Sequence, residues 1–126
     1  MKRKILGAVL GFFAWWVVAT VLDRLLRLAW PHYAEVLKAF AFTLGMLIAR
    51  LVEGAASTLA AGFVAAWVAR KPGGAALATG VLLLALFVPT HAMIWDKFPV
   101  WYHLLFLSSL VPLTLLGARL LPARSV

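Results

Sequence analysis

Long apolar runs alternate with short clusters of charged and turn-forming residues, and this pattern predicts four membrane-spanning helices. The run from Ile5 to Leu22 holds roughly 18 residues, enough to cross a bilayer as a helix. The run could be mistaken for a signal peptide, but its aromatic middle and the following Asp23-Arg24 pair lack the small residues of a cleavage site. We therefore interpret it as an uncleaved first helix. We predict helices over residues 4–22, 34–70, 75–95 and 100–121, within a single domain of residues 1–126.

The second apolar region is too long for one ordinary crossing. A continuous helix over residues 34–70 would exceed about 50 Å, against about 30 Å of hydrocarbon. We predict an elongated helix that protrudes or tilts, with two separate pieces as the alternative. If the basic residues at its end mark one interface, Arg50 lies near the other and Glu53 about one turn deeper. Residues 36–49 then form an interfacial or partner-covered extension. A frame over 40–62 would place both charges at mid-membrane, which costs more.

Composition supports the membrane assignment. The chain has 126 residues, of which 65% are hydrophobic and 13% are charged. Soluble domains are about 45–50% apolar, and a core this small cannot hide the excess from water. The fold class is therefore an all-α, polytopic, four-helix transmembrane bundle whose first partner is the lipid bilayer. The chain has no cysteine, which excludes disulfides, thiolate metal sites and cysteine nucleophiles.

The formal charge of +8 reflects topology rather than nucleic-acid binding, because the basic residues cluster at the ends of apolar runs. One side of the membrane would hold Lys2, Arg3, Lys4, Arg70, Lys71, Arg119 and Arg124. The other side would hold Arg24, Arg27, Lys38 and Lys97, diluted by Asp23, Glu35 and Asp96. The positive-inside rule then predicts an inner-membrane protein with both termini in the cytoplasm.

Polar side chains of three helices should meet at one depth, in the outer leaflet. The second helix supplies Arg50, Glu53 and Ser57, the third supplies His91, and the fourth supplies His103. Polar groups are expensive against lipid, so they should face each other or a wet cavity. We predict a ligand or ion site from these five residues. The plainer interpretation is structural: Arg50 and Glu53 pair at i and i+3, and each histidine bonds a carbonyl.

Several chemistries fit such a site. Carboxylate and imidazole can exchange protons with a small solute or ion near neutral pH. Arg50 with His91 could hold an anionic ligand or a lipid headgroup. Two less favoured alternatives are zinc on two imidazoles and Glu53, which lacks an HExxH-like spacing, and a haem between His91 and His103. No serine has a nucleophile motif and no glycine-rich phosphate loop is present, so we assign no catalytic residue, metal or required cofactor.

Small residues recur at spacing four and predict close helix contacts, either inside the bundle or between copies. They are Gly7 and Gly11, then Gly54, Thr58, Gly62 and Ala66, then Ala76 and Gly80.

The leading hypothesis is a non-enzymatic inner-membrane protein whose outer-leaflet polar site binds or helps to move a small solute, ion or lipid. A thin four-helix bundle has little room for a private aqueous path, so transport would call for a homo-oligomer. The alternatives are an accessory or assembly subunit of a larger membrane complex, and a membrane enzyme or b-type haem protein using His91 and His103.

Overall fold

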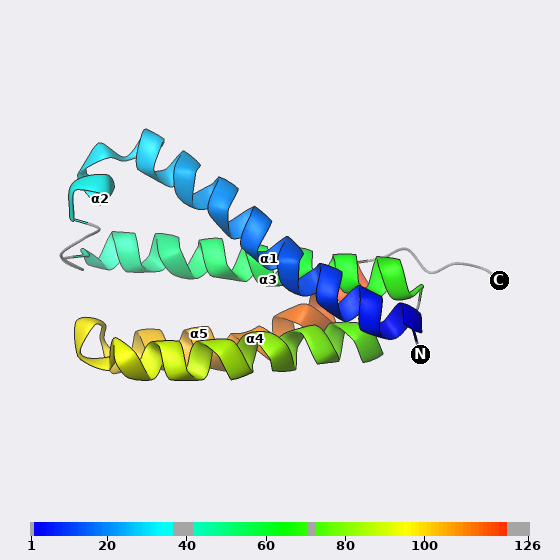
Figure 1. The fold of residues 1–126 in the computed structure, drawn as a ribbon. Coiled ribbons are helices and arrows are strands. Elements are labelled where there is room, and N and C mark those ends of the chain that lie inside the picture. Colours follow the sequence, from blue (N-terminus) through cyan, green and yellow to red (C-terminus); the bar gives the residue numbers. More distant parts are fainter. Residues whose placement is uncertain (1, 37–41, 71–72, 121–126) are drawn as a thin grey trace.

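The computed structural model describes residues 2–36, 42–70 and 73–120 and is all-α over these ranges. Four helices are long and apolar enough to cross a membrane, and they pack as a bundle (Figure 1). The chain is therefore a small polytopic membrane protein, which confirms the all-α, four-helix bundle part of the predicted fold class. In chain order the elements are α1 (Lys2–Ala29), α2 (Pro31–Val36), α3 (Leu44–Ala69), α4 (Gly74–Met93), the 3₁₀ turn η1 (Trp95–Lys97) and α5 (Val100–Arg119).

The prediction of an elongated second helix over residues 34–70 was wrong, and the two-piece alternative is correct. The short helix α2 begins at Pro31 and ends at Val36, and α3 begins only at Leu44. Thr43 adopts an extended backbone and its hydroxyl accepts a hydrogen bond from the Met46 amide at 3.3 Å, which caps α3. A helix cannot run through a residue in that conformation. Residues 37–41 of the predicted extension lie outside the described residues.

The first helix is longer than predicted. It continues past residue 22 to Ala29, about two further turns, and Asp23 and Arg27 form an ion pair of 2.7 Å at i and i+4 that stabilises this extension. The charges expected to mark the end of the helix therefore lie on it. The break comes at Trp30, and Pro31 opens α2, because proline lacks the N–H that a first helical residue leaves unbonded. The third and fourth helices match their predicted ranges to within two residues at each end.

Close packing at small residues holds the bundle together. A Cβ atom on Gly7 would lie 2.5 Å from the carbonyl oxygen of Ala65, and one on Gly11 would lie 2.7 Å from that of Ala61, so α1 crosses α3 almost backbone to backbone. A Cβ atom on Gly62 would overlap the carbonyl of Thr114 on α5. These small-residue stripes therefore serve contacts within the bundle.

A buried aromatic core lies near the crossing of α1 and α3, beyond which α1 diverges. Trp15 is buried against Phe87 and Phe106, and its Nε1–H donates to Thr58 Oγ1 at 3.0 Å. Beyond this crossing, α1 leans away from the other helices toward the end that carries α2 and η1 (Figure 1). The start of α1 and the end of α5 are both at the opposite end of the bundle (Figure 1).

Candidate functional site

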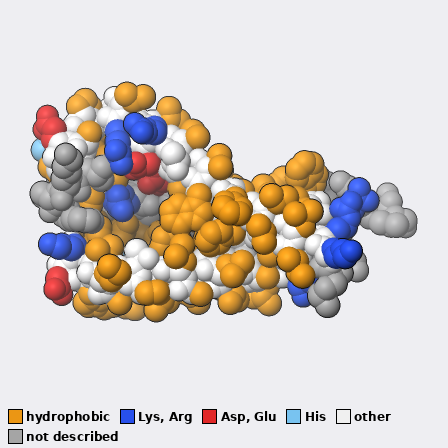
Figure 2. Space-filling view, in the orientation of Figure 1, with side chains coloured by type: hydrophobic (Ala, Val, Ile, Leu, Met, Phe, Trp, Pro, Cys, Tyr) orange, Lys and Arg blue, Asp and Glu red, His pale blue; other side chains and the backbone are white. Residues whose placement is uncertain are grey.

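A groove of about 510 Å³ lies where α1 diverges from α3. Its charged lining comes from Asp23, Arg24 and Arg27 on α1 and from Arg50 and Glu53 on α3. The rest of its wall is Trp16, Ala19, Thr20 and Phe42. Figure 2 shows blue and red side chains gathered in this hollow, while the flanks of the molecule are largely orange. Most charges of this half of the protein thus face inward to the groove.

Arg50 is fixed in place by aromatic residues from three segments. Its Nη1–H donates to the Tyr33 hydroxyl at 2.7 Å, and its Nε–H donates to the Tyr102 hydroxyl at 3.2 Å. The guanidinium also lies 4.8 Å from the centre of the Phe42 ring and 5.6 Å from that of Phe98, within cation–π range. Two of its five N–H groups are engaged in these bonds, so a rigid, partly exposed cation faces the groove.

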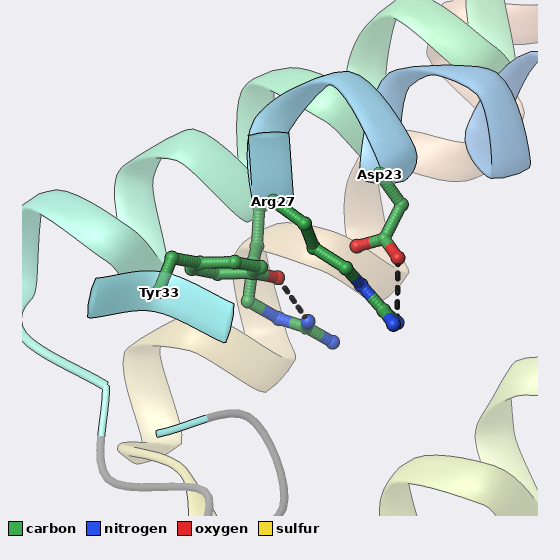
Figure 3. Close-up of polar contacts among 4 residues, drawn as sticks. Asp23, Arg27 and Tyr33 are labelled. Atoms are coloured by element: carbon green, nitrogen blue, oxygen red, sulfur yellow. Dashed lines mark hydrogen bonds and ion pairs between the residues drawn. The ribbon is translucent and has the colours of Figure 1, made fainter. Parts of the chain in front are cut away.

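Tyr33 ties the short helix α2 to α3 through this bond (Figure 3). The residue has no exposed surface. Burial raises the pKa of its phenol above the usual 10.0, although the neighbouring Arg50 partly opposes this. The phenol is therefore neutral at physiological pH and serves as a stable hydrogen-bond acceptor for the arginine.

Arg27 offers a second cation with an unused donor. Its Nη2 lies 2.7 Å from the Asp23 carboxylate, and Figure 3 shows this pair next to Tyr33. Its Nε–H is buried and has no hydrogen-bond partner among the described residues. Asp23 thus satisfies only one side of the guanidinium.

Glu53 has an unused hydrogen-bond acceptor, as Arg27 has an unused donor. Its Oε1 is buried and has no hydrogen-bond partner within the described ranges. Both side chains of the predicted i, i+3 pair are described, and no ion pair within 4.0 Å joins Arg50 to Glu53. The simple helix-locking pair is therefore not formed. Ser57 lies one turn further, fully buried, and its hydroxyl donates to the backbone carbonyl of Glu53 at 2.8 Å. It lines neither the groove nor the cavity described next.

A second, more enclosed cavity of about 140 Å³ lies on the inner side of Arg50 and Glu53, which border both spaces. His91 and Thr90 of α4 and Tyr102 of α5 also line it. The predicted convergence of Arg50, Glu53 and His91 on a common space is thus present in the structure. His103 has no exposed surface and reaches this space only through His91.

The two histidines bond each other directly. Their Nδ1 atoms are 2.6 Å apart, and His103 Nε2 lies 3.1 Å from the carbonyl oxygen of Trp95. The carbonyl can only accept, so His103 carries its proton on Nε2. His103 Nδ1 therefore accepts a hydrogen bond from the Nδ1–H group of His91. The other ring nitrogen of His91, Nε2, then carries no proton and keeps a basic lone pair.

This geometry does not match the metal alternatives. Two axial haem ligands must hold an iron between them, and two nitrogens 2.6 Å apart leave no room for one. A zinc site would need Glu53 to join the pair, yet no three His, Cys, Asp or Glu side chains of the described residues cluster as metal ligands. His91 and His103 therefore form a hydrogen-bonded pair, which does not fit the less favoured alternative of haem ligation.

Several lining residues were missed from the sequence. Asp23, Arg24 and Arg27 were interpreted as topology signals, and Tyr33 and Tyr102 were not assigned to the site. The signal that could have found the α1 residues is their spacing, since positions 20, 23, 24 and 27 share one helix face.

A comparison of the chain with models of known protein families, with curated proteins and with solved structures found no match. The groove and its residues therefore carry the functional inference alone.

Proposed function

We propose that the protein binds the phosphate-bearing headgroup of a membrane lipid in the groove between α1 and α3. The observation that supports this is a hollow with three arginines in its lining, Arg24, Arg27 and Arg50, in the side of an otherwise apolar helix bundle. Arginine is well suited to phosphate because its planar fork of donors matches the phosphate oxygens. Two carboxylates in the same groove leave a net positive charge of one.

The form of the groove favours an amphiphile over a soluble anion. Trp16, Ala19 and Phe42 give it an apolar wall beside the charged one. The α1 surface around it exposes large apolar side chains such as Val21 and Leu25 to the bilayer. A lipid could therefore enter sideways, with its headgroup among the arginines and its chains along the apolar surface.

The length of α1 gives the groove a suitable depth. The helix has 28 residues and is about 42 Å long, more than the roughly 30 Å of hydrocarbon. With the basic residues Lys2 to Lys4 at one interface, the turn that carries Asp23 and Arg27 reaches the other. Phosphate groups of lipids lie at this level. The charge distribution predicts that both termini are cytoplasmic, so the groove would open to the outer leaflet of the inner membrane.

Movement of the lipid and assembly into an oligomer stay predictions of the leading hypothesis. The groove by itself supports binding. Delivery or transfer of the bound lipid would need a second state in which α1 closes on α3 or opens further.

The proposal is tested by native mass spectrometry of the full chain, purified in detergent and titrated with single lipids. Phosphatidylethanolamine, phosphatidylglycerol and phosphatidylcholine should be retained, and diacylglycerol, which lacks the phosphate, should not. A variant with both Arg24→Gln and Arg27→Gln should lose phospholipid retention. The single Arg119→Gln control, exposed at the far end of α5, should keep it. Equal retention of diacylglycerol, or undiminished binding by the double variant, would overturn the proposal.

A further inference from the structure

Two buried polar atoms of opposite kind lie unpaired in the groove. They are Arg27 Nε, which can only donate a hydrogen bond, and Glu53 Oε1, a carboxyl oxygen that accepts one when the group is ionised. Both residues line the same hollow, from α1 and α3 respectively. Folded proteins leave few buried polar atoms without a partner, because each lost bond costs the full desolvation of the group. These are the unpaired buried side-chain atoms found among the described residues.

The two atoms do not satisfy each other. No ion pair within 4.0 Å joins Arg27 to Glu53, although both side chains are described and carry opposite charges. Arg27 is instead held by Asp23 on its own helix, and Arg50 is held by two phenols. Neither arginine is thus bonded to the Glu53 carboxylate, and the carboxylate faces the groove with a buried acceptor still unused.

A ligand that satisfies both atoms must accept at one end and donate at the other. A phosphate oxygen would accept from Arg27 Nε–H, and a protonated primary amine would donate to Glu53 Oε1. We infer that the groove selects a zwitterion with an anionic phosphate and a primary ammonium group, the chemistry of an aminophospholipid headgroup or of free phosphoethanolamine. This inference rests on the proposed function and adds a second recognition element to it.

Glu53 is the residue that sets this specificity. A quaternary trimethylammonium group has the same charge as a primary ammonium but no N–H, so it cannot donate to the carboxylate. Phosphatidylglycerol has the phosphate but no cation. Phosphatidylcholine, which carries the trimethylammonium group, and phosphatidylglycerol should both bind through the arginines and leave Glu53 Oε1 without its ionic partner. Loss of one charge-assisted hydrogen bond corresponds to about a tenfold loss of affinity or more.

The test is a competition by native mass spectrometry on the full chain in detergent, with phosphatidylethanolamine against phosphatidylcholine and against phosphatidylglycerol of the same acyl chains. Phosphatidylethanolamine should win by about tenfold. Glu53→Gln should remove the preference for phosphatidylethanolamine over phosphatidylcholine, and it should not lower the affinity for phosphatidylglycerol, because the loss of a carboxylate removes a repulsion from this anionic lipid. Its matched control is Glu35→Gln, which removes an exposed carboxylate on α2 at the same end of the bundle. Because Glu53 Oε1 has no hydrogen-bond partner within the part of the chain that the structure describes, the amide should preserve the fold, and a thermal unfolding curve will verify this.

The outcomes separate the inference from the function on which it rests. If all three lipids compete equally in both wild type and Glu53→Gln, the ammonium selection is wrong, while loss of binding in the Arg24 and Arg27 variant would still support a phosphate site. If soluble phosphoethanolamine displaces the lipid at comparable concentration, the zwitterion chemistry is upheld and the lipid as its source is overturned. If no phospholipid binds, both proposals fail together.

Discussion

Replacing Tyr33 with phenylalanine should loosen α2 from α3 and lower the stability of the protein. The hydroxyl accepts a 2.7 Å hydrogen bond from the Arg50 guanidinium at a site with no exposed surface. A hydrogen bond to a charged group contributes about 1.5–3 kcal/mol. Arg50 keeps its bond to Tyr102 and can meet water in the groove, so we expect a loss of about 1–2 kcal/mol.

Thermal unfolding in detergent, followed by the fluorescence of the six tryptophans, would measure the loss as a decrease in Tm of several degrees. Glu35→Gln is the control on the same short helix, because its pairing with His32 is exposed and worth little. The decisive comparison is a double-mutant cycle. In an Arg50→Gln background, Tyr33→Phe should cost much less than in wild type. An equal cost in both backgrounds, or no cost in wild type, would refute the role assigned to this bond.

Three further predictions concern packing, the histidine pair and pH. Gly62→Ala should lower the Tm in detergent because its Cβ would overlap a backbone carbonyl of α5, whereas Gly45→Ala, whose Cβ would meet its nearest side-chain atom at 3.6 Å, should not. His103→Phe should lower the free energy of unfolding by about 1–3 kcal/mol, because it leaves the buried His91 N–H unpaired. Adding His91→Phe should lower it little further, because both polar partners are then gone, and the Tm values of the two variants check this. Since the folded state raises the pKa of Tyr33 above 10.0, it holds that proton more tightly than the unfolded chain does, so stability should fall as pH rises above about 10. Tm measured against alkaline pH should fall more steeply in wild type than in Tyr33→Phe.

The spanning helices could be predicted from the sequence because length and hydropathy alone decide them. The position of the break before α3 could not, because Thr43 lies between the apolar residues Phe42 and Leu44 and its capping role depends on one local bond to Met46. A hydropathy profile averages over such a residue. The same averaging placed the end of the first helix at its first charges, although Asp23 and Arg27 continue it.

The level of the candidate residues along the bundle could be predicted from the sequence, but the direction in which each side chain points could not. Counting residues along antiparallel helices placed Arg50, Glu53 and His91 at one level, and these three do border one cavity. Depth says nothing about how each helix is rotated, so the direct bond between His91 and His103 was not foreseen. The groove depends further on the angle at which α1 leaves the bundle, which follows from close crossings at glycines far from the site.

The central claim is that a lipid headgroup lies between α1 and α3. The most direct measurement is photo-crosslinking in nanodiscs with phosphatidylethanolamine that carries a diazirine close to its headgroup, followed by peptide mapping of the adducts. We predict adducts concentrated on Trp16, Thr20 and Phe42, the uncharged wall of the groove, and their loss when Arg24 and Arg27 are both replaced with glutamine. Adducts spread evenly over the exposed apolar faces of α4 and α5, and unchanged in that variant, would contradict the account.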